Sequence, residues 1–103
     1  MKLIQELEEK IEDEIHDIKE YAKMAIEVKE KHPSLAQTLY TISTQEANHQ
    51  AMLHAEVVKL IEEHRKMHGE PPAAMMAVYD YLHKKQIEKM AEARRYQEEY
   101  QHR

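Results

Sequence analysis

Apolar residues recur at alternating intervals of four and three along the first two thirds of the chain. The first stripe contains Leu7, Ile11, Glu14, Ile18, Tyr21, Ala25 and Val28. The second contains Leu35, Leu39, Ile42, Glu46, His49, Leu53, Val57 and Leu60. This spacing places each set on one side of an α-helix, because three to four residues complete a helical turn. The sequence therefore predicts two long helices, each with one inward-facing seam.

The two stripes are separated by His32-Pro33. A residue that precedes proline avoids the helical region, so the first helix must end there. The next residues, Ser34-Leu35-Ala36-Gln37, have the pattern of a capping box, which is typical of a helix start. We expect helix 1 over about residues 2–31 and helix 2 over about 34–67. The short turn between them predicts an antiparallel hairpin.

A third helix is expected after Gly69 and Pro71-Pro72, which end helix 2. Proline suits a first helical position, so this helix is predicted over about residues 72–101. Its expected inward residues are Met75, Tyr79, Leu82, Gln86, Met90, Ala93 and Tyr100. The 103 residues are predicted to form one all-α domain.

Composition excludes several classes of function. The chain has no cysteine, which rules out disulfides, thiolate catalysis, cysteine-ligated zinc and iron–sulfur clusters and fits a reducing cytoplasm, where we expect the protein. The net charge of −5 argues against nucleic acid as a partner, since phosphate binding needs cationic surface. The N-terminus becomes charged too early for a signal peptide, and no apolar run approaches the ~20 residues of a membrane span.

Three polar residues interrupt the apolar seams: Glu14, Glu46 and His49. An acidic residue three positions before a histidine is a weak signal, because 20 acids and eight histidines in 103 residues give about 8 × 20/103 ≈ 1.6 such pairs by chance. Glu46 and His49 differ from the other such pairs because both occupy a seam. The midpoint between Glu14 and this pair is about residue 31, at the turn. All three side chains should therefore lie at one level of the hairpin.

Burying unpaired carboxylates costs several kcal/mol each, so three such groups in an apolar bundle need a compensating partner. A bound cation would suit all three side chains. Two metal-free alternatives remain open. Glu14 and His49 can pair as carboxylate and imidazolium, or the polar group can set the register of a dimer interface.

These residues carry a resemblance that covers about residues 1–65. A glutamate on helix 1, a tyrosine seven residues later and Glu-x-x-His on helix 2 resemble the first half of a rubrerythrin or ferritin-like protein, with Glu14, Tyr21, Glu46 and His49 in those places. The resemblance implies a di-iron site, with Mn or Zn as other occupants. It implies Glu14, Glu46 and His49 as metal ligands, Tyr21 as a hydrogen-bond donor to a ligand, and Asp17 as a weaker supporting residue.

The chain departs from this family because it has no fourth helix and no second Glu-x-x-His hairpin. A two-fold dimer would supply four carboxylates and two imidazoles, as in the short encapsulated-ferritin type. The resemblance then implies a homodimer or higher oligomer with ferroxidase or peroxide- and oxygen-handling activity. Without a cysteine-ligated iron site, any redox function would need an external electron donor or oxidant. The alternative is a metal-free helical oligomerisation or interaction protein with a relic polar site.

Overall fold

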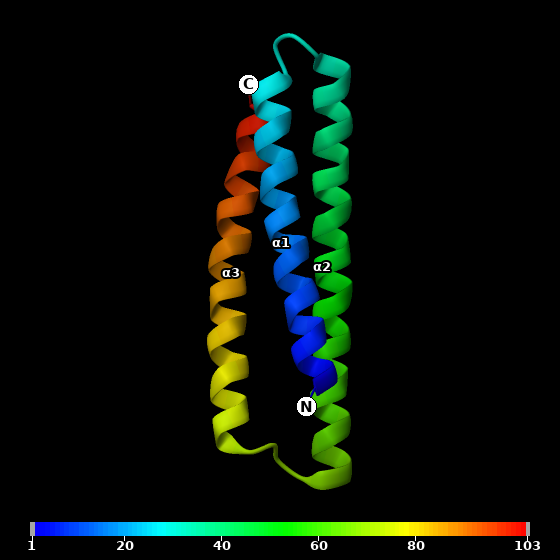
Figure 1. The fold of residues 1–103 in the computed structure, drawn as a ribbon, viewed down its shortest axis with the longest axis vertical. Helices are drawn as coiled ribbons and strands as arrows, with labels where there is room; N and C mark the ends of the chain where they lie inside the picture. Colours follow the sequence, from blue (N-terminus) through cyan, green and yellow to red (C-terminus); the bar gives the residue numbers. More distant parts are fainter. Residues whose placement is uncertain (1, 103) are drawn as a thin grey trace.

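The computed structural model describes residues 2–102 and contains three long helices (Figure 1). These are α1 (Lys2–Val28), α2 (Pro33–His68) and α3 (Ala73–Gln101). The chain runs up α1, down α2 and up α3, because the connections at residues 29–32 and 69–72 are short. The predicted all-α fold and antiparallel hairpin are confirmed. No helix within residues 2–102 combines the length and hydropathy that a membrane crossing requires.

The turn between α1 and α2 differs from the prediction at both of its ends. Helix α1 ends at Val28, and the chain reverses over the next residues, where the His32 amide donates to the Val28 carbonyl at 2.7 Å. Helix α2 begins at Pro33, whose fixed φ is already suited to a first helical position. The predicted capping box is wrong, since the N-cap is His32 and its side chain forms no capping hydrogen bond.

Helix α1 lies between the other two helices and packs along both of them, whereas α2 and α3 touch little (Figure 1). The molecule is accordingly elongated, with extents of 56 × 18 × 18 Å. Its radius of gyration is 16.6 Å, against about 13 Å for a compact domain of this length. This arrangement makes α1 the central element and leaves one face of the α1–α2 hairpin uncovered by α3.

The buried residues of α1 extend beyond the predicted seam. They are Ile4, Glu8, Ile11, Ile15, Ile18, Ala22 and Ala25. This set has its own four-three spacing. It shares Ile11, Ile18 and Ala25 with the predicted stripe and adds four neighbouring residues, because α1 is covered on two sides. On α3 the buried residues are Gln86, Met90, Ala93 and Tyr100, all of which belong to the predicted stripe.

On α2 the buried face is rotated relative to the prediction. Its buried residues are Ala36, Leu39, Ser43, Val57 and Ile61. Leu35, expected inside, is 48% exposed, so its predicted placement is wrong. The rotation turns α2 toward the side on which α3 packs, where the Ser43 hydroxyl accepts a hydrogen bond from Gln97 of α3 at 2.9 Å. The same hydroxyl donates to the Ile18 carbonyl of α1 at 2.7 Å, so one buried serine links all three helices.

Candidate metal centre

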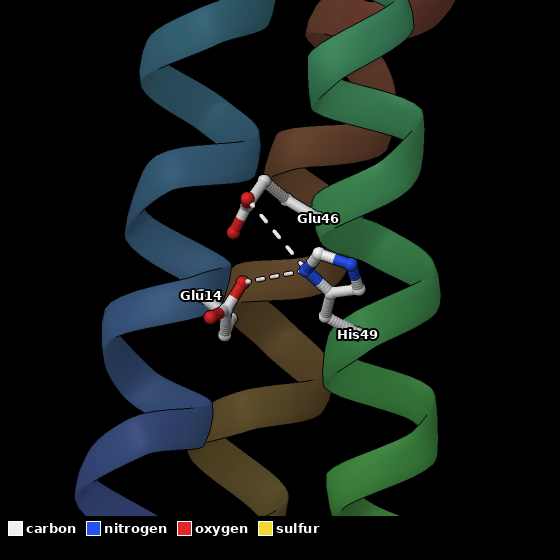
Figure 2. Close-up of side chains that lie close together, drawn as sticks. All are labelled: Glu14, Glu46 and His49. Carbon is white, nitrogen blue, oxygen red and sulfur yellow. Dashed lines mark ion pairs between the residues drawn. The ribbon is translucent and has the colours of Figure 1, made fainter.

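The side chains of Glu14, Glu46 and His49 come together halfway along the hairpin (Figure 2). Glu14 comes from α1, and the other two lie one turn apart on α2. Each offers one ligand atom, and these atoms all lie within 4.8 Å of one another. The expectation that equal distances from the turn place the three residues at one level is confirmed.

The imidazole of His49 faces both carboxylates through the same nitrogen. Its Nδ1 lies 3.7 Å from Glu14 Oε2 and 3.7 Å from Glu46 Oε1. These distances exceed those of hydrogen bonds, so neither carboxylate is hydrogen-bonded to the imidazole ring. Ligand atoms bound to one ion at about 2.0–2.2 Å lie roughly 3.0–3.5 Å from each other. The observed spacing is therefore close to that of a set of ligands converging on one point.

The three side chains differ in burial, which partly corrects the sequence prediction. The side chains of Glu46 and Glu14 are 19% and 25% exposed, but that of His49 is 53% exposed. His49 does not point inward as predicted, because the rotation of α2 carries it to the edge of the packed face. The cluster is thus half-open to solvent, which gives an ion a path of entry.

One buried carboxylate oxygen at this site lacks a hydrogen-bond donor within residues 2–102. Oε2 of Glu14 is buried, and no hydrogen-bond donor within residues 2–102 reaches it. A buried charged oxygen without a donor is costly, and a bound ion is one of the ordinary explanations for such an atom. The same oxygen is the one that faces His49 Nδ1. The donor set and this orphaned oxygen therefore fit a cation.

The cluster lies on the uncovered face of the hairpin, and α3 passes behind it (Figure 2). Apolar side chains continue along this face in both directions. Leu3 and Leu35, 54% and 48% exposed, each lie about three turns before Glu14 and Glu46 on their own helices. The polar cluster is thus set in an exposed apolar surface.

Tyr21 and Asp17 are both half-buried on α1. Tyr21 packs against the buried group that contains Ala25, Leu39 and Tyr100. Across residues 2–102, neither Tyr21 nor Asp17 forms a hydrogen bond with the cluster. Their roles beside a metal ligand stay predictions that the resemblance alone supports.

Helix α3 does not complete the ligand set. Within the described residues, no further histidine or acidic side chain joins the group of three. Glu92, an acid of α3 that faces α1, pairs with Lys19 at 3.1 Å instead. The link at residues 69–72 is also too short for the long crossover of a ferritin-like bundle. Within the described residues, the group therefore consists of two carboxylates and one imidazole.

Sequence reasoning missed a second polar group, which is buried more deeply than the first. Glu8 is 4% exposed, and its Oε2 accepts a hydrogen bond from Gln86 Nε2 of α3 at 2.5 Å. Its Oε1 is buried and has no partner within residues 2–102. The signal was present, since Ile4, Glu8 and Ile11 share the second four-three stripe of α1. Next to this group the rings of His54 and His83 stack with centroids 4.7 Å apart.

No protein-family model, no curated protein and no solved structure matches this chain. The ferritin-like resemblance thus rests only on Glu14, Tyr21, Glu46 and His49 and on the hairpin that carries them.

Proposed function

We propose that this protein binds iron at a di-metal carboxylate centre shared between two copies of the chain. The observation that carries the proposal is the convergence of Glu14, Glu46 and His49 within 4.8 Å, with a buried Glu14 oxygen that lacks a donor. Carboxylate and imidazole donors suit iron and manganese, and zinc is also accommodated by such sites. Two copies would bring together the four carboxylates and two imidazoles of a ferritin-like centre.

The position of the cluster supports sharing between two chains. It lies in the uncovered face of the hairpin, where exposed apolar side chains flank it on both helices. In a two-fold dimer the same face of each chain meets its own copy. Such contact would bury this face and bring the two clusters toward each other. The half-exposed His49 would then become enclosed.

The chemistry that follows is oxidation of ferrous ions. Iron held by Glu14, Glu46 and His49 would supply one-electron oxidation, so that two ferrous ions would reduce one peroxide to two water molecules with the uptake of two protons. The chain would contribute the acidic oxygens of Glu14 and Glu46, which favour the ferric product. Because His49 must be neutral to act as a ligand, protons compete with metal for the site. Reduction of the product would require an external electron donor.

Metal content after anaerobic loading with ferrous iron tests this proposal. The unaltered protein should retain about one iron per chain, since a di-iron site is shared by two chains. Removing a ligand by Glu46→Gln or His49→Ala should lower iron retention at least about tenfold, since loss of a residue that only supports a ligand already lowers metal affinity about 10- to 100-fold. The control is Glu63→Gln, an exposed acid on α2 outside the cluster, which should retain iron normally. Absence of retained iron in the unaltered protein would refute the proposal.

A metal-free oligomerisation protein is the second candidate function. The observation that favours it is the pair of 3.7 Å contacts from His49 to Glu14 and Glu46, which become ion pairs when the imidazole is protonated. In this case the cluster would set the register of the interface. A protein that self-associates but retains no ferrous iron, manganese or zinc would establish this second function over the first.

A further inference from the structure

A groove lies at the end of the molecule remote from the α1–α2 turn. Helix α2 has 36 residues and α1 has 27, so the last turns of α2 and the first turns of α3 extend past the start of α1 (Figure 1). The groove lies between the first turns of α1 and those of α3, which line its two sides. The groove has a volume of about 580 Å³, within the range of roughly 300–1,000 Å³ found for small-molecule sites.

The two long walls of this groove differ in chemistry. The wall from α3 is apolar and consists of Ala74, Met75, Met76, Val78, Tyr79 and Leu82. The wall from α1 is acidic, with Glu8, Glu9 and Glu12 beside Ile4 and Gln5. Ile61 of α2 also lines it, and no lysine, arginine or histidine is among the lining residues. An apolar wall opposite an acidic wall suits a ligand that is both apolar and cationic.

Glu8 distinguishes this wall from an ordinary acidic surface. It is 4% exposed, whereas Glu9 and Glu12 are exposed to solvent. Its Oε2 is occupied by Gln86, but its buried Oε1 has no hydrogen-bond partner within residues 2–102. A buried carboxylate oxygen without a donor attracts a cationic donor strongly, because the surrounding low dielectric screens the charge weakly. Its charge also acts on neighbouring Tyr79: burial, and after it the charge of Glu8, raises the pKa of that phenol.

We propose that this groove binds an aliphatic ammonium ion, with the hydrocarbon chain along the α3 wall and the ammonium group at the Glu8 side. A primary ammonium offers three N–H donors, and one of them meets the unpartnered oxygen of Glu8. Glu9 and Glu12 add negative potential at the mouth and draw the cation in. The site is independent of the Glu14, Glu46 and His49 cluster and does not rest on metal binding.

Calorimetric titration with dodecylammonium and with dodecanoate, both below their micelle concentrations and in the presence of a chelator, tests the assignment. Dodecylammonium should bind at least about tenfold more tightly than dodecanoate, as expected for one charge-assisted hydrogen bond. Shortening the chain to decylammonium should weaken binding about fourfold for each methylene removed. Failure of dodecylammonium to bind, or equal affinity for the carboxylate, would overturn the proposal.

Two pairs of variants separate the acidic wall from the apolar wall. Glu8→Gln should weaken dodecylammonium binding about tenfold, while the control Glu6→Gln, an exposed acid outside the groove, should not. Val78→Lys should abolish binding, and Ile87→Lys, at a similarly exposed α3 position outside the groove, should preserve it. Val78 is 58% exposed, so its substitution leaves the core intact. Thermal unfolding checks that each variant is folded. If Glu8→Gln or Val78→Lys bound dodecylammonium as tightly as the unaltered protein does, the proposed site would be contradicted.

Discussion

A single hydroxyl group makes hydrogen bonds to two helices at the centre of this protein. Ser43 of α2 donates to the Ile18 carbonyl of α1 and accepts from Gln97 of α3. Ser43 is fully buried, so solvent water cannot replace these hydrogen bonds if they are lost. It is also three residues before Glu46 and therefore holds α2 in the rotation that presents the candidate metal ligands. The net contribution of such a buried polar group to the free energy of unfolding is small, and its main effect is to fix how the helices are oriented.

Ser43→Ala should lower the free energy of unfolding by about 1–2 kcal/mol, since both hydrogen bonds are lost and the side-chain donor of Gln97 is left without this partner. Urea denaturation followed by circular dichroism measures the change. Ser34→Ala is the control, because Ser34 is an exposed serine on the same helix and should change stability by less than about 0.5 kcal/mol. Equal effects of the two substitutions would contradict the role given to Ser43.

At the scale of the helices, the contact between α2 and α3 is sparse and includes two histidines. The rings of His54 on α2 and His83 on α3 stack at 4.7 Å with an interplanar angle of 11°. The rings of Tyr79 and His83 also stack, with centroids 6.0 Å apart, and the charge of Glu8 acts on His54 from α1. Burial, followed by the charge of His83, lowers the pKa of His54 below its ordinary value of 6.5, and Glu8 opposes this shift. The α2–α3 contact is thus favoured when His54 is neutral.

Acid should therefore weaken the fold through His54. The unfolded chain binds the His54 proton more readily than the folded protein, so the free energy of unfolding should fall as pH drops below 6.5 toward the lowered pKa, and His54 should have no effect above that window. Urea denaturation at pH 7.5 and 5.5 tests this. His54→Asn should lose less stability between these values than the unaltered protein. His16→Asn, at an exposed histidine of α1, should behave like the unaltered protein, and an undiminished loss in His54→Asn would disprove the coupling.

At the scale of the whole molecule, α3 covers one side of the hairpin and leaves the other open. The open side carries the candidate metal ligands together with Leu3 and Leu35, and these two leucines are about half exposed. An elongated chain of this size buries only part of its apolar surface, so self-association would add burial that the monomer lacks. The functional proposal therefore depends on the quaternary state.

We expect a concentration-dependent dimer through the open face. Leu35→Lys should weaken dimerisation at least about tenfold, because one apolar contact is replaced by a charge at the interface. Sedimentation equilibrium measures the dissociation constant. The control is Ile87→Lys, an exposed apolar residue of α3 on another surface, which should leave the constant unchanged. A strict monomer at high concentration, with or without ferrous iron, would exclude the shared site.

Much of this structure follows from local pattern. The spacing of apolar residues predicted the first two helices, and His32-Pro33 predicted the turn between them. Gly69 and Pro71-Pro72 predicted the end of the second helix and the start of the third. The position of Glu14, Glu46 and His49 at one level followed from that turn, because residues at equal distances from a hairpin turn face each other. These properties need only helix periodicity and chain connectivity, which adjacent residues specify.

The rotation of each helix was decided by tertiary packing. A four-three stripe is broad enough to tolerate a shift of one residue, so the spacing alone does not fix which side of α1 is buried. Packing α3 on α1 buried Glu8 and the second stripe, turned α2 so that Ser43 is inside, and carried Leu35 and His49 outward. Burial depends on which surfaces meet, and no single helix contains that information. The candidate centre is therefore half-open in one chain.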